Sequence, residues 1–233
     1  MDESTKRSIV ASVDNWIFAN INIPLNCACG WYAMKLILEL AKHGVRAVFQ
    51  AGTTEFQVNN NAEGNNAFSY VFEGLDTPRA INSIAIGSLP EMHCWAAIPD
   101  TQEIIDLSWK HQASRHKEVN GESWDKSLRL QPYFWGTQKE LFAKSRIRNG
   151  IMSGSYARYY VNREATMYAF DLFVGAISGQ DECRVFSKGA MKELYRDLVD
   201  YLAMSYGHHG VESENSAISV HGDDLHGLQR SPA

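Results

Sequence analysis

An apolar helix that begins with a cysteine is the feature that most constrains how this chain can fold. Between residues 29 and 44 (CGWYAMKLILELAKHG) the apolar side chains recur at helical spacing, namely Ala33, Met34, Ile37, Leu38 and Ala41. Gly44 follows at the position where a helix commonly ends in a left-handed residue. Cys29 is therefore predicted to lie at the positive end of the helix dipole, where the thiolate is favoured over the thiol.

A predicted hairpin further along the chain supplies two more polar groups. Residues 93–98 (HCWAAI) and 103–107 (EIIDL) have the composition of short strands, and the residues between them (PDTQ) are typical of a turn. Because side chains alternate along a strand, His93 and Trp95 share one face. We expect antiparallel pairing to bring Asp106 beside His93, with Trp95 over the pair, whereas a slip of one residue would turn Asp106 away.

A thiol, an imidazole and a carboxylate in this order are the parts of a nucleophilic cysteine site. Each residue alone has an ordinary structural interpretation, because buried cysteines are commonly inert and an isolated histidine or aspartate can simply belong to a core or a strand end. Together, in a helix followed by a hairpin, they favour a triad. The prediction is that Cys29 is the nucleophile, His93 the general base and Asp106 the acid that orients it.

These motifs resemble the transglutaminase-like core of the papain-like cysteine protease superfamily. The resemblance covers about residues 23–110 and consists of C-x-W-Y-A at Cys29, a helix ending in H-G-V-R-A, a glycine after a strand, H-x-W at His93, and I-D-L-S at Asp106. It implies an α+β fold in which the nucleophile helix packs on an antiparallel β-sheet, with histidine and aspartate on adjacent strands. It also implies that Trp95 is the aromatic residue that often follows the histidine.

Two features of the candidate site stay open. Cys27 lies two residues before Cys29, so the residue type does not decide which thiol is the nucleophile. The donor for an oxyanion is also open, since Asn22 and Asn26 both offer a side-chain amide beside the backbone N–H of the helix start. Trp31 and Trp95 are candidate substrate-binding residues, although aromatic residues at such positions more commonly belong to the core.

Composition narrows the class of protein. The chain has 233 residues and a formal net charge of −5, with no basic cluster for nucleic acid and no apolar run long enough to span a membrane. The N-terminus lacks a secretory pattern, and four cysteines without framework spacing fit a reducing cytoplasm. No cofactor is expected. A zinc site built from Cys27, Cys29, His93 and Cys94 is disfavoured, because no second closely spaced pair of ligands accompanies them.

The remaining chain is predicted to complete one catalytic domain over residues 1–206, with a disordered polar tail at 207–233. Helices are expected near residues 9–17, after Asn162 and after Ser187. The further predictions are strands at 45–51, 56–58 and 67–72, a polar loop at 59–66, loops held by Trp109, Trp124 and Trp135, and solvated side chains at His111 and His116.

The predicted activity is cleavage or transfer at an amide, in a peptide, an isopeptide or a glutamine side chain, through a thioester on Cys29. The partner would be a peptide, a protein or a small amide. The alternative is a catalytically inactive transglutaminase-like module that binds a peptide or partner. The triad does not distinguish water from an amine as the acceptor, and it identifies neither the substrate nor the oligomeric state.

Overall fold

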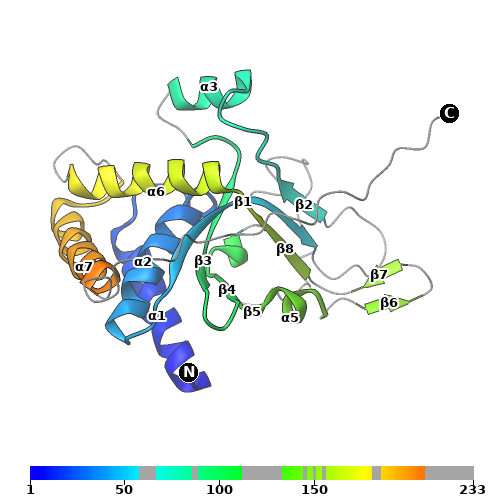
Figure 1. The fold of residues 1–233 in the computed structure, drawn as a ribbon, viewed down its shortest axis with the longest axis horizontal. Coiled ribbons are helices and arrows are strands. Elements are labelled where there is room, and N and C mark those ends of the chain that lie inside the picture. Colours follow the sequence, from blue (N-terminus) through cyan, green and yellow to red (C-terminus); the bar gives the residue numbers. More distant parts are fainter. Residues whose placement is uncertain are drawn as a thin grey trace, which may run out of the picture.

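A bent antiparallel sheet with helices against it organises the computed structural model, which describes residues 1–57, 67–85, 89–111, 133–143, 146–148, 151–153, 156–179 and 185–207. The predicted α+β class with an antiparallel sheet is confirmed. The main sheet contains β1 (Val48–Gln57), β2 (Ala67–Tyr70), β3 (His93–Ile98), β4 (Glu103–Asp106), β5 (Phe134–Thr137) and β8 (Tyr156–Val161). Its order is β2-β1-β3-β4-β5, with β8 paired to β1 (Figure 1).

Helices α1, α2, α6 and α7 gather on one side of this sheet, while α5 and a small hairpin lie toward the other side (Figure 1). The helices are α1 (Glu3–Asn20), α2 (Cys29–Lys42), α3 (Pro78–Ala85), α5 (Gln138–Ala143), α6 (Arg163–Ser178) and α7 (Lys188–Gly207). Two 3₁₀ turns, η1 (Leu25–Cys27) and η2 (Trp109–His111), and the hairpin of β6 (Arg146–Arg148) with β7 (Ile151–Ser153) complete the described elements.

The helix boundaries follow the predicted capping signals. Helix α2 begins at Cys29, and Gly44 beyond its end has the left-handed φ of 69° that was expected. Asn162 caps α6 by accepting a hydrogen bond from the N–H of Ala165 at 3.0 Å. Ser187 likewise accepts from the N–H of Ala190 at the start of α7, at 3.3 Å. These three helix predictions are confirmed, as is the buried apolar stripe of α1.

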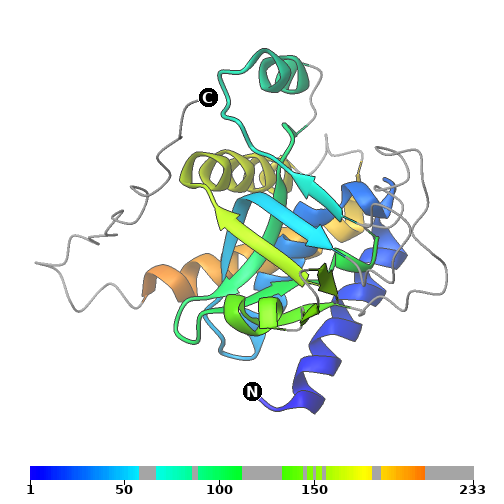
Figure 2. The same ribbon diagram turned by 90° about the vertical axis from the view of Figure 1, so that its right-hand side faces the viewer.

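The prediction of two separate strands at 45–51 and 56–58 is wrong, because β1 is one strand of ten residues. Its middle, Gly52-Thr53-Thr54, lacks the apolar alternation of a strand but is held extended by β8, which pairs with it from Gly52 onward. Figure 2 shows β1 and β8 side by side. A Cβ on Gly52 would lie 2.2 Å from the backbone oxygen of Tyr160, so this crossing requires glycine.

The two faces of the sheet have different cores. The helical side contains a large aliphatic cluster that draws on α1, α2, α6 and α7. The opposite face carries an aromatic cluster made of Phe56, Tyr70, Trp95, Trp109, Phe134, Ala157 and Tyr159. The side chain of Gln138 in α5 ties β5 to β8, donating to the carbonyl of Ala157 at 3.0 Å and accepting from the N–H of Tyr159 at 2.9 Å.

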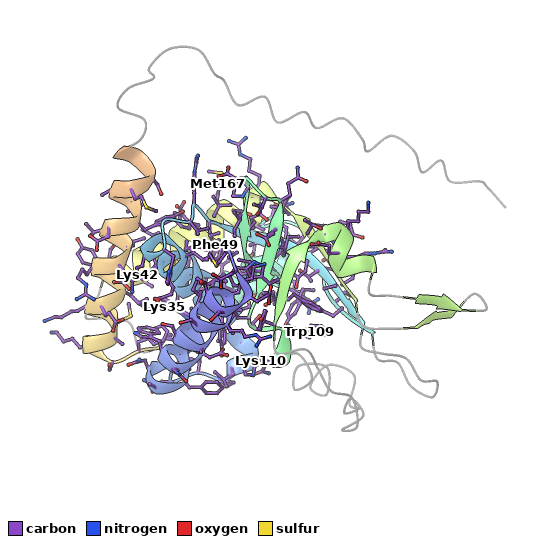
Figure 3. The ribbon with its side chains drawn as sticks, turned by 90° about the horizontal axis from the view of Figure 1, so that it is seen from below. Lys35, Lys42, Phe49, Trp109, Lys110 and Met167 are labelled. Atoms are coloured by element: carbon purple, nitrogen blue, oxygen red, sulfur yellow. The ribbon has the colours of Figure 1, made fainter. Side chains whose placement is uncertain are left out.

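A buried lysine joins α2 to α7. Lys35 Nζ lies 3.2 Å from Asp197 Oδ2 and 3.3 Å from Glu193 Oε1. The half-exposed Lys42 also binds Oδ2 of Asp197, with its Nζ at 2.7 Å. Figure 3 shows both lysines beside α7. Lys35 also lies 4.8 Å from the ring centre of Trp16 in α1. These contacts set how α2, and with it Cys29, is placed among its neighbours.

The environment of His111 differs from the prediction. The expectation that His111 is solvated is wrong, because it is half-buried by the turn at η2, and a ring nitrogen lies 3.1 Å from the hydroxyl of Tyr32. Burial together with the charge of Lys110 lowers the pKa of His111 to about 4.

Strand β2 confirms the strand expected at 67–72. Helix α3 had no counterpart among the predictions.

Several predictions lie outside the described residues: the polar loop at 59–66, Trp124, His116 and the tail from residue 208 onward. Trp109 is described and fully buried. Within the described ranges, no helix has both the length and the apolar character needed to cross a membrane.

Candidate active site

Helix α2 places Cys29 at its first position, against β3. The Cys29 side chain is buried, with 7% of its surface exposed. The N-cap residue Ala28 makes no capping hydrogen bond with its side chain, and the N–H groups in the first turn of an α-helix have no intrahelical acceptor. Cys27, in the turn η1 just before the helix, is exposed. The two thiols that the sequence left as alternatives are therefore in different environments, and Cys29 is the one that faces the sheet.

The hairpin of β3 and β4 has the register that brings histidine and aspartate together. Ala96 pairs with Ile105 and Ala97 with Ile104, so one step further Trp95 lies opposite Asp106 on the face of His93. His93 Nε2 is 2.8 Å from Asp106 Oδ2, and both side chains are buried. The predicted contact between these two residues is present.

Three further hydrogen bonds hold the carboxylate of Asp106. The backbone N–H and the hydroxyl of Ser108 donate to Oδ1 at 2.9 and 2.7 Å. The hydroxyl of Tyr159 in β8 donates to Oδ2 at 2.9 Å, the oxygen that also faces His93. With His93, this makes two hydrogen bonds on each oxygen, so Asp106 is fixed in orientation as well as in place.

The ring of His93 lies among aromatic side chains. Tyr70 stacks on it with 5.0 Å between ring centres, Phe56 meets it edge-on at 5.1 Å, and Trp95 is parallel at 6.4 Å. Because Nε2 is engaged by Asp106, Nδ1 is the nitrogen left for other chemistry. Nδ1 has no hydrogen-bond partner among the described residues. It nevertheless lies close enough to Cys29 for each group to affect the other's pKa.

A second buried thiol also contacts Cys29. Cys94 follows His93 in β3 and therefore points to the other face of the sheet, toward α2. Cys94 lies close enough to Cys29 for its thiol to stabilise the thiolate, and this effect, with the proximity and positive charge of His93, outweighs burial and lowers the pKa of Cys29 well below its ordinary value of 9.0. The same contact, reinforced by burial, raises the pKa of Cys94. Cys29 is thus the thiol that ionises and Cys94 the one that keeps its proton.

Burial and charge act in opposite directions on the two partners of the hairpin. Burial alone would lower the pKa of His93, but the negative charge and hydrogen bond of Asp106, followed by those of Cys29, raise it to about 10. Burial likewise disfavours the charged form of Asp106, yet His93, Ser108 and Tyr159 together lower its pKa. The site therefore favours a thiolate, an imidazolium and a carboxylate in contact.

The candidate oxyanion and substrate-binding residues differ in their burial and in their contacts. Asn26 is buried in η1, whereas the side chain of Asn22 is exposed and its backbone N–H donates to Val185 at 2.8 Å. Trp31 packs edge-to-face against Phe173 and Phe186, within the aliphatic core and away from the aromatic face. Trp95 is also buried, and its indole donates to the side chain of Gln50 at 2.9 Å.

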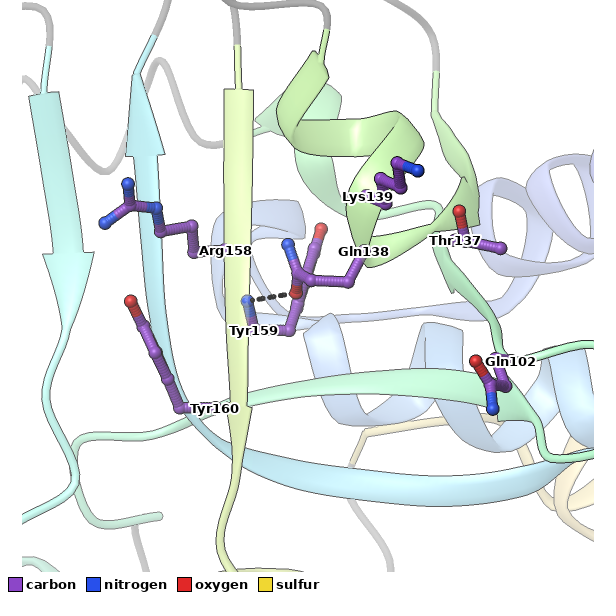
Figure 4. Close-up of a pocket in the computed structure, with 7 residues that line it drawn as sticks. All are labelled: Gln102, Thr137, Gln138, Lys139, Arg158, Tyr159 and Tyr160. Atoms are coloured by element: carbon purple, nitrogen blue, oxygen red, sulfur yellow. Dashed lines mark hydrogen bonds between the residues drawn. The ribbon is translucent and has the colours of Figure 1, made fainter. Parts of the chain in front are cut away.

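A cavity of about 840 Å³ opens between α5, β8 and the turn before β4 (Figure 4). Its described lining includes Lys139, Arg158, Tyr159 and Tyr160, and contains none of the three triad residues. Tyr159 connects the two places, because it borders this cavity and donates its hydroxyl to Asp106. The volume is in the range that small ligands occupy.

In the part of the chain that the structure describes, no group of three or more His, Cys, Asp or Glu residues is placed to hold a metal ion. The predicted divergence of the neighbours His93 and Cys94 onto opposite faces of β3 is present.

Three residues of the site were not among the sequence candidates: Ser108, Cys94 and Tyr159. Ser108 has a local signal, since an aspartate followed two residues later by a serine is typical of a side-chain-to-backbone turn. The placement of Cys94 follows from the alternation already used for His93. Tyr159 has no local signal, because its contact with Asp106 depends on β8 pairing with β1.

Comparison of the chain with family models, with curated proteins and with solved structures returned no match.

Proposed function

We propose that this protein is a cysteine-dependent hydrolase or acyltransferase that acts on an amide through a thioester on Cys29. The observation that carries the proposal is the contact of His93 Nε2 with Asp106 Oδ2 at 2.8 Å, which leaves Nδ1 for Cys29. A histidine oriented by a carboxylate, with its other nitrogen beside a thiol of lowered pKa, is the arrangement that activates a cysteine nucleophile.

In the first half-reaction the Cys29 thiolate attacks the amide carbonyl carbon and forms a C–S bond. The negative charge moves to the carbonyl oxygen, where the N–H groups of the first turn of α2, which Ala28 leaves without a side-chain cap, are suited to stabilise it. His93 then gives the proton on Nδ1 to the leaving nitrogen as the C–N bond breaks. The products are a free amine and an acyl group on Cys29.

In the second half-reaction His93, now neutral, accepts a proton at Nδ1 from the acceptor. Water as the acceptor yields an acid, and an amine yields a new amide, with the Cys29 thiolate as the leaving group in both. Throughout, Asp106 holds the imidazole and balances its charge, helped by Ser108 and Tyr159. The substrate is a peptide, a protein or a small amide.

The proposal extends to the fold, as a transglutaminase-like core of the papain-like superfamily. It is supported by a cysteine at the start of a helix that packs on β3, and by histidine and aspartate on the adjacent antiparallel strands β3 and β4. The second half of the chain contributes as well, because β8 pairs with β1 and supplies Tyr159.

One observation favours the alternative of a catalytically inactive binding module. Cys29 is only 7% exposed, and the cavity beside Tyr159 is lined by other residues among those described. A module that binds a ligand in that cavity would need no reactive thiol. The two candidates therefore differ in one measurable property, the reactivity of Cys29.

The test is alkylation by iodoacetamide as a function of pH, followed for each cysteine by mass spectrometry. The proposal predicts that Cys29 labels fast at pH values well below 9.0, its ordinary pKa. His93→Ala should slow this labelling about tenfold or more near neutral pH, since a free thiol is only a few per cent ionised there. Asp106→Asn should lower turnover on the order of 10³-fold by releasing the histidine.

Cys27→Ser is the matched control, because Cys27 is an exposed thiol two residues away and its loss should change nothing. If Cys29 labels slowly and His93→Ala does not change the rate, the enzyme proposal is wrong and the binding module is the remaining candidate. Once reactivity is established, peptides containing glutamine, offered with and without a primary amine, separate hydrolysis from transfer.

A further inference from the structure

Cys94 is a buried thiol that the acyl-transfer mechanism does not use. It lies in β3 between His93 and Trp95, but on the face of the sheet that packs against α2. Its side chain belongs to the same buried cluster as Cys29, at the contact of α2 with β3, and the two thiols are close enough for each to affect the other's pKa. The two side chains converge from different elements, 65 positions apart in the chain (94 − 29).

We propose that Cys29 and Cys94 are a modification site, at which a hydroperoxide links the two sulfurs in an intramolecular disulfide that blocks the nucleophile and is reversed by thiols. Two cysteines with diverging side chains cannot be bridged without backbone movement. Here α2 packs on β3, both side chains lie in the one buried cluster at this contact, and each thiol is within reach of the other's charge. The inference rests on the same Cys29 thiolate as the proposed function.

The chemistry has two steps. In the first, the Cys29 thiolate attacks one oxygen of the hydroperoxide, the O–O bond breaks, and the alcohol or water leaves after taking up a proton. The sulfur of Cys29 is oxidised by two electrons to a sulfenic acid, and the peroxide is reduced. In the second, the sulfur of Cys94 attacks the sulfenic sulfur. The S–S bond forms, the S–O bond breaks, and the oxygen leaves as water with the thiol proton of Cys94.

The positions of the neighbours assign different roles to the two thiols. His93 and the Cys94 thiol both stabilise charge on Cys29, so Cys29 is the sulfur that meets the oxidant. Cys94 is more deeply buried, with 1% of its surface exposed, and it needs no access to the oxidant because its target is the sulfenic acid beside it. Without Cys94, the sulfenic acid would be open to further oxidation to the sulfinic acid, which ordinary thiols do not reduce.

The experiment uses the full chain, reduced, freed of reductant and treated with one equivalent of hydrogen peroxide. The expected result is a protein lighter by two hydrogen atoms, with a peptide that joins Cys29 to Cys94 and with iodoacetamide labelling of Cys29 lost. Dithiothreitol should restore this labelling. In Cys94→Ala, peroxide should instead add oxygen atoms at Cys29, and dithiothreitol should not restore the labelling after excess peroxide.

Cys27→Ser is again the matched control and should still form the bridge, because Cys27 is exposed and lies outside the buried pair. The wild-type peptide map needs no variant, so the test stands even if Cys94→Ala folds poorly. A map in which Cys29 pairs with Cys27, or gains oxygen without any bridge, would overturn the inference.

Failure of the inference and failure of the proposed function give different results. Fast alkylation of Cys29 without a Cys29–Cys94 bridge removes the modification site and leaves the acyl-transfer site intact. A Cys29–Cys94 disulfide in a protein that forms no acyl-thioester with any amide would support the modification site and remove the proposed acyl-transfer function.

Discussion

The hydroxyl of Tyr159 donates a hydrogen bond of 2.9 Å to Oδ2 of Asp106, across a separation of 53 residues in the chain. The same oxygen receives the N–H of His93 at 2.8 Å. Tyr159 therefore acts on the histidine through the aspartate, as a positioning residue. Burial, with the nearby charge of Asp106, raises the pKa of the Tyr159 hydroxyl well above its ordinary value, so it remains a donor.

Tyr159→Phe should preserve the aromatic packing on Trp95 and remove this one hydrogen bond. A hydrogen bond to a charged group contributes about 1.5–3 kcal/mol, so we expect turnover to fall about tenfold or more. The alkylation profile of Cys29 should also shift along the pH axis, which a purely structural role would not cause. Tyr160→Phe is the control, since the Tyr160 side chain is 48% exposed and alternation along β8 turns it to the opposite face from Tyr159. Equal effects of the two changes would contradict the assignment.

The thiolate and imidazolium have opposite effects on stability as the pH changes. The raised pKa of His93 contributes stability that is complete below 6.5 and is lost as the pH rises through about 10. The lowered pKa of Cys29 contributes stability that is complete above 9.0 and is lost as the pH falls through its folded value. Between 6.5 and 9.0, at pH values above the folded pKa of Cys29, the two proton differences cancel, so this pair gives the wild type little slope there.

In Cys29→Ser the contribution of His93 to the pH dependence of the free energy of unfolding should become visible. Asp106 still raises the pKa of His93 when the thiolate is gone. The free energy of unfolding of this variant should fall as the pH rises above 6.5, by up to about 1.4 kcal/mol per pH unit relative to wild type. Urea titrations at several pH values measure this difference. Parallel pH curves for the two proteins would show that Cys29 and His93 are not an ion pair.

Gly30, the second residue of α2, has no room for a side chain. A Cβ there would lie 2.1 Å from the ring of Phe173, which is itself held edge-on by Trp31. We expect Gly30→Ala to reduce the free energy of unfolding by about 1–3 kcal/mol, as overpacking does. Gly175→Ala in α6 meets nothing within 4 Å and should stabilise the helix by up to about 1 kcal/mol. Thermal unfolding of the two variants, expected to shift in opposite directions, is the measurement.

Removal of the buried charge of Lys35 should cost stability. Lys35→Met leaves the buried Asp197 with only the more exposed partners Lys42 and Arg196 among the described residues, and we expect a loss of about 3 kcal/mol. Lys42→Met, at a side chain 43% exposed, should cost about 1 kcal/mol or less. Adding Asp197→Leu to Lys35→Met should restore part of the loss, because the buried carboxylate is removed together with its buried partner. If the double variant is less stable than Lys35→Met alone, the network contributes more than charge compensation.

Local signals were sufficient for the elements that carry Cys29, His93 and Asp106. The helical spacing of 29–44 and its glycine end predicted α2, and alternation around a turn predicted the hairpin and its shared face. These patterns are local because a helix cap or a tight turn depends on a few neighbouring residues. The break expected in β1 shows the limit, since Gly52-Thr53-Thr54 is held extended by pairing with β8, β3 and β2, which lie far away in the chain.

The sequence by itself determined which faces of the elements are apolar and which order the thiol, imidazole and carboxylate follow along the chain. Only the tertiary structure decided that Cys29 faces both His93 and Cys94 while Cys27 stays exposed, and that Tyr159 holds Asp106. The physical reason is that periodicity specifies which side of an element must be buried, but not which partner covers it. That choice follows from strand pairing and from buried contacts such as Lys35 with Asp197, which join residues far apart in the chain.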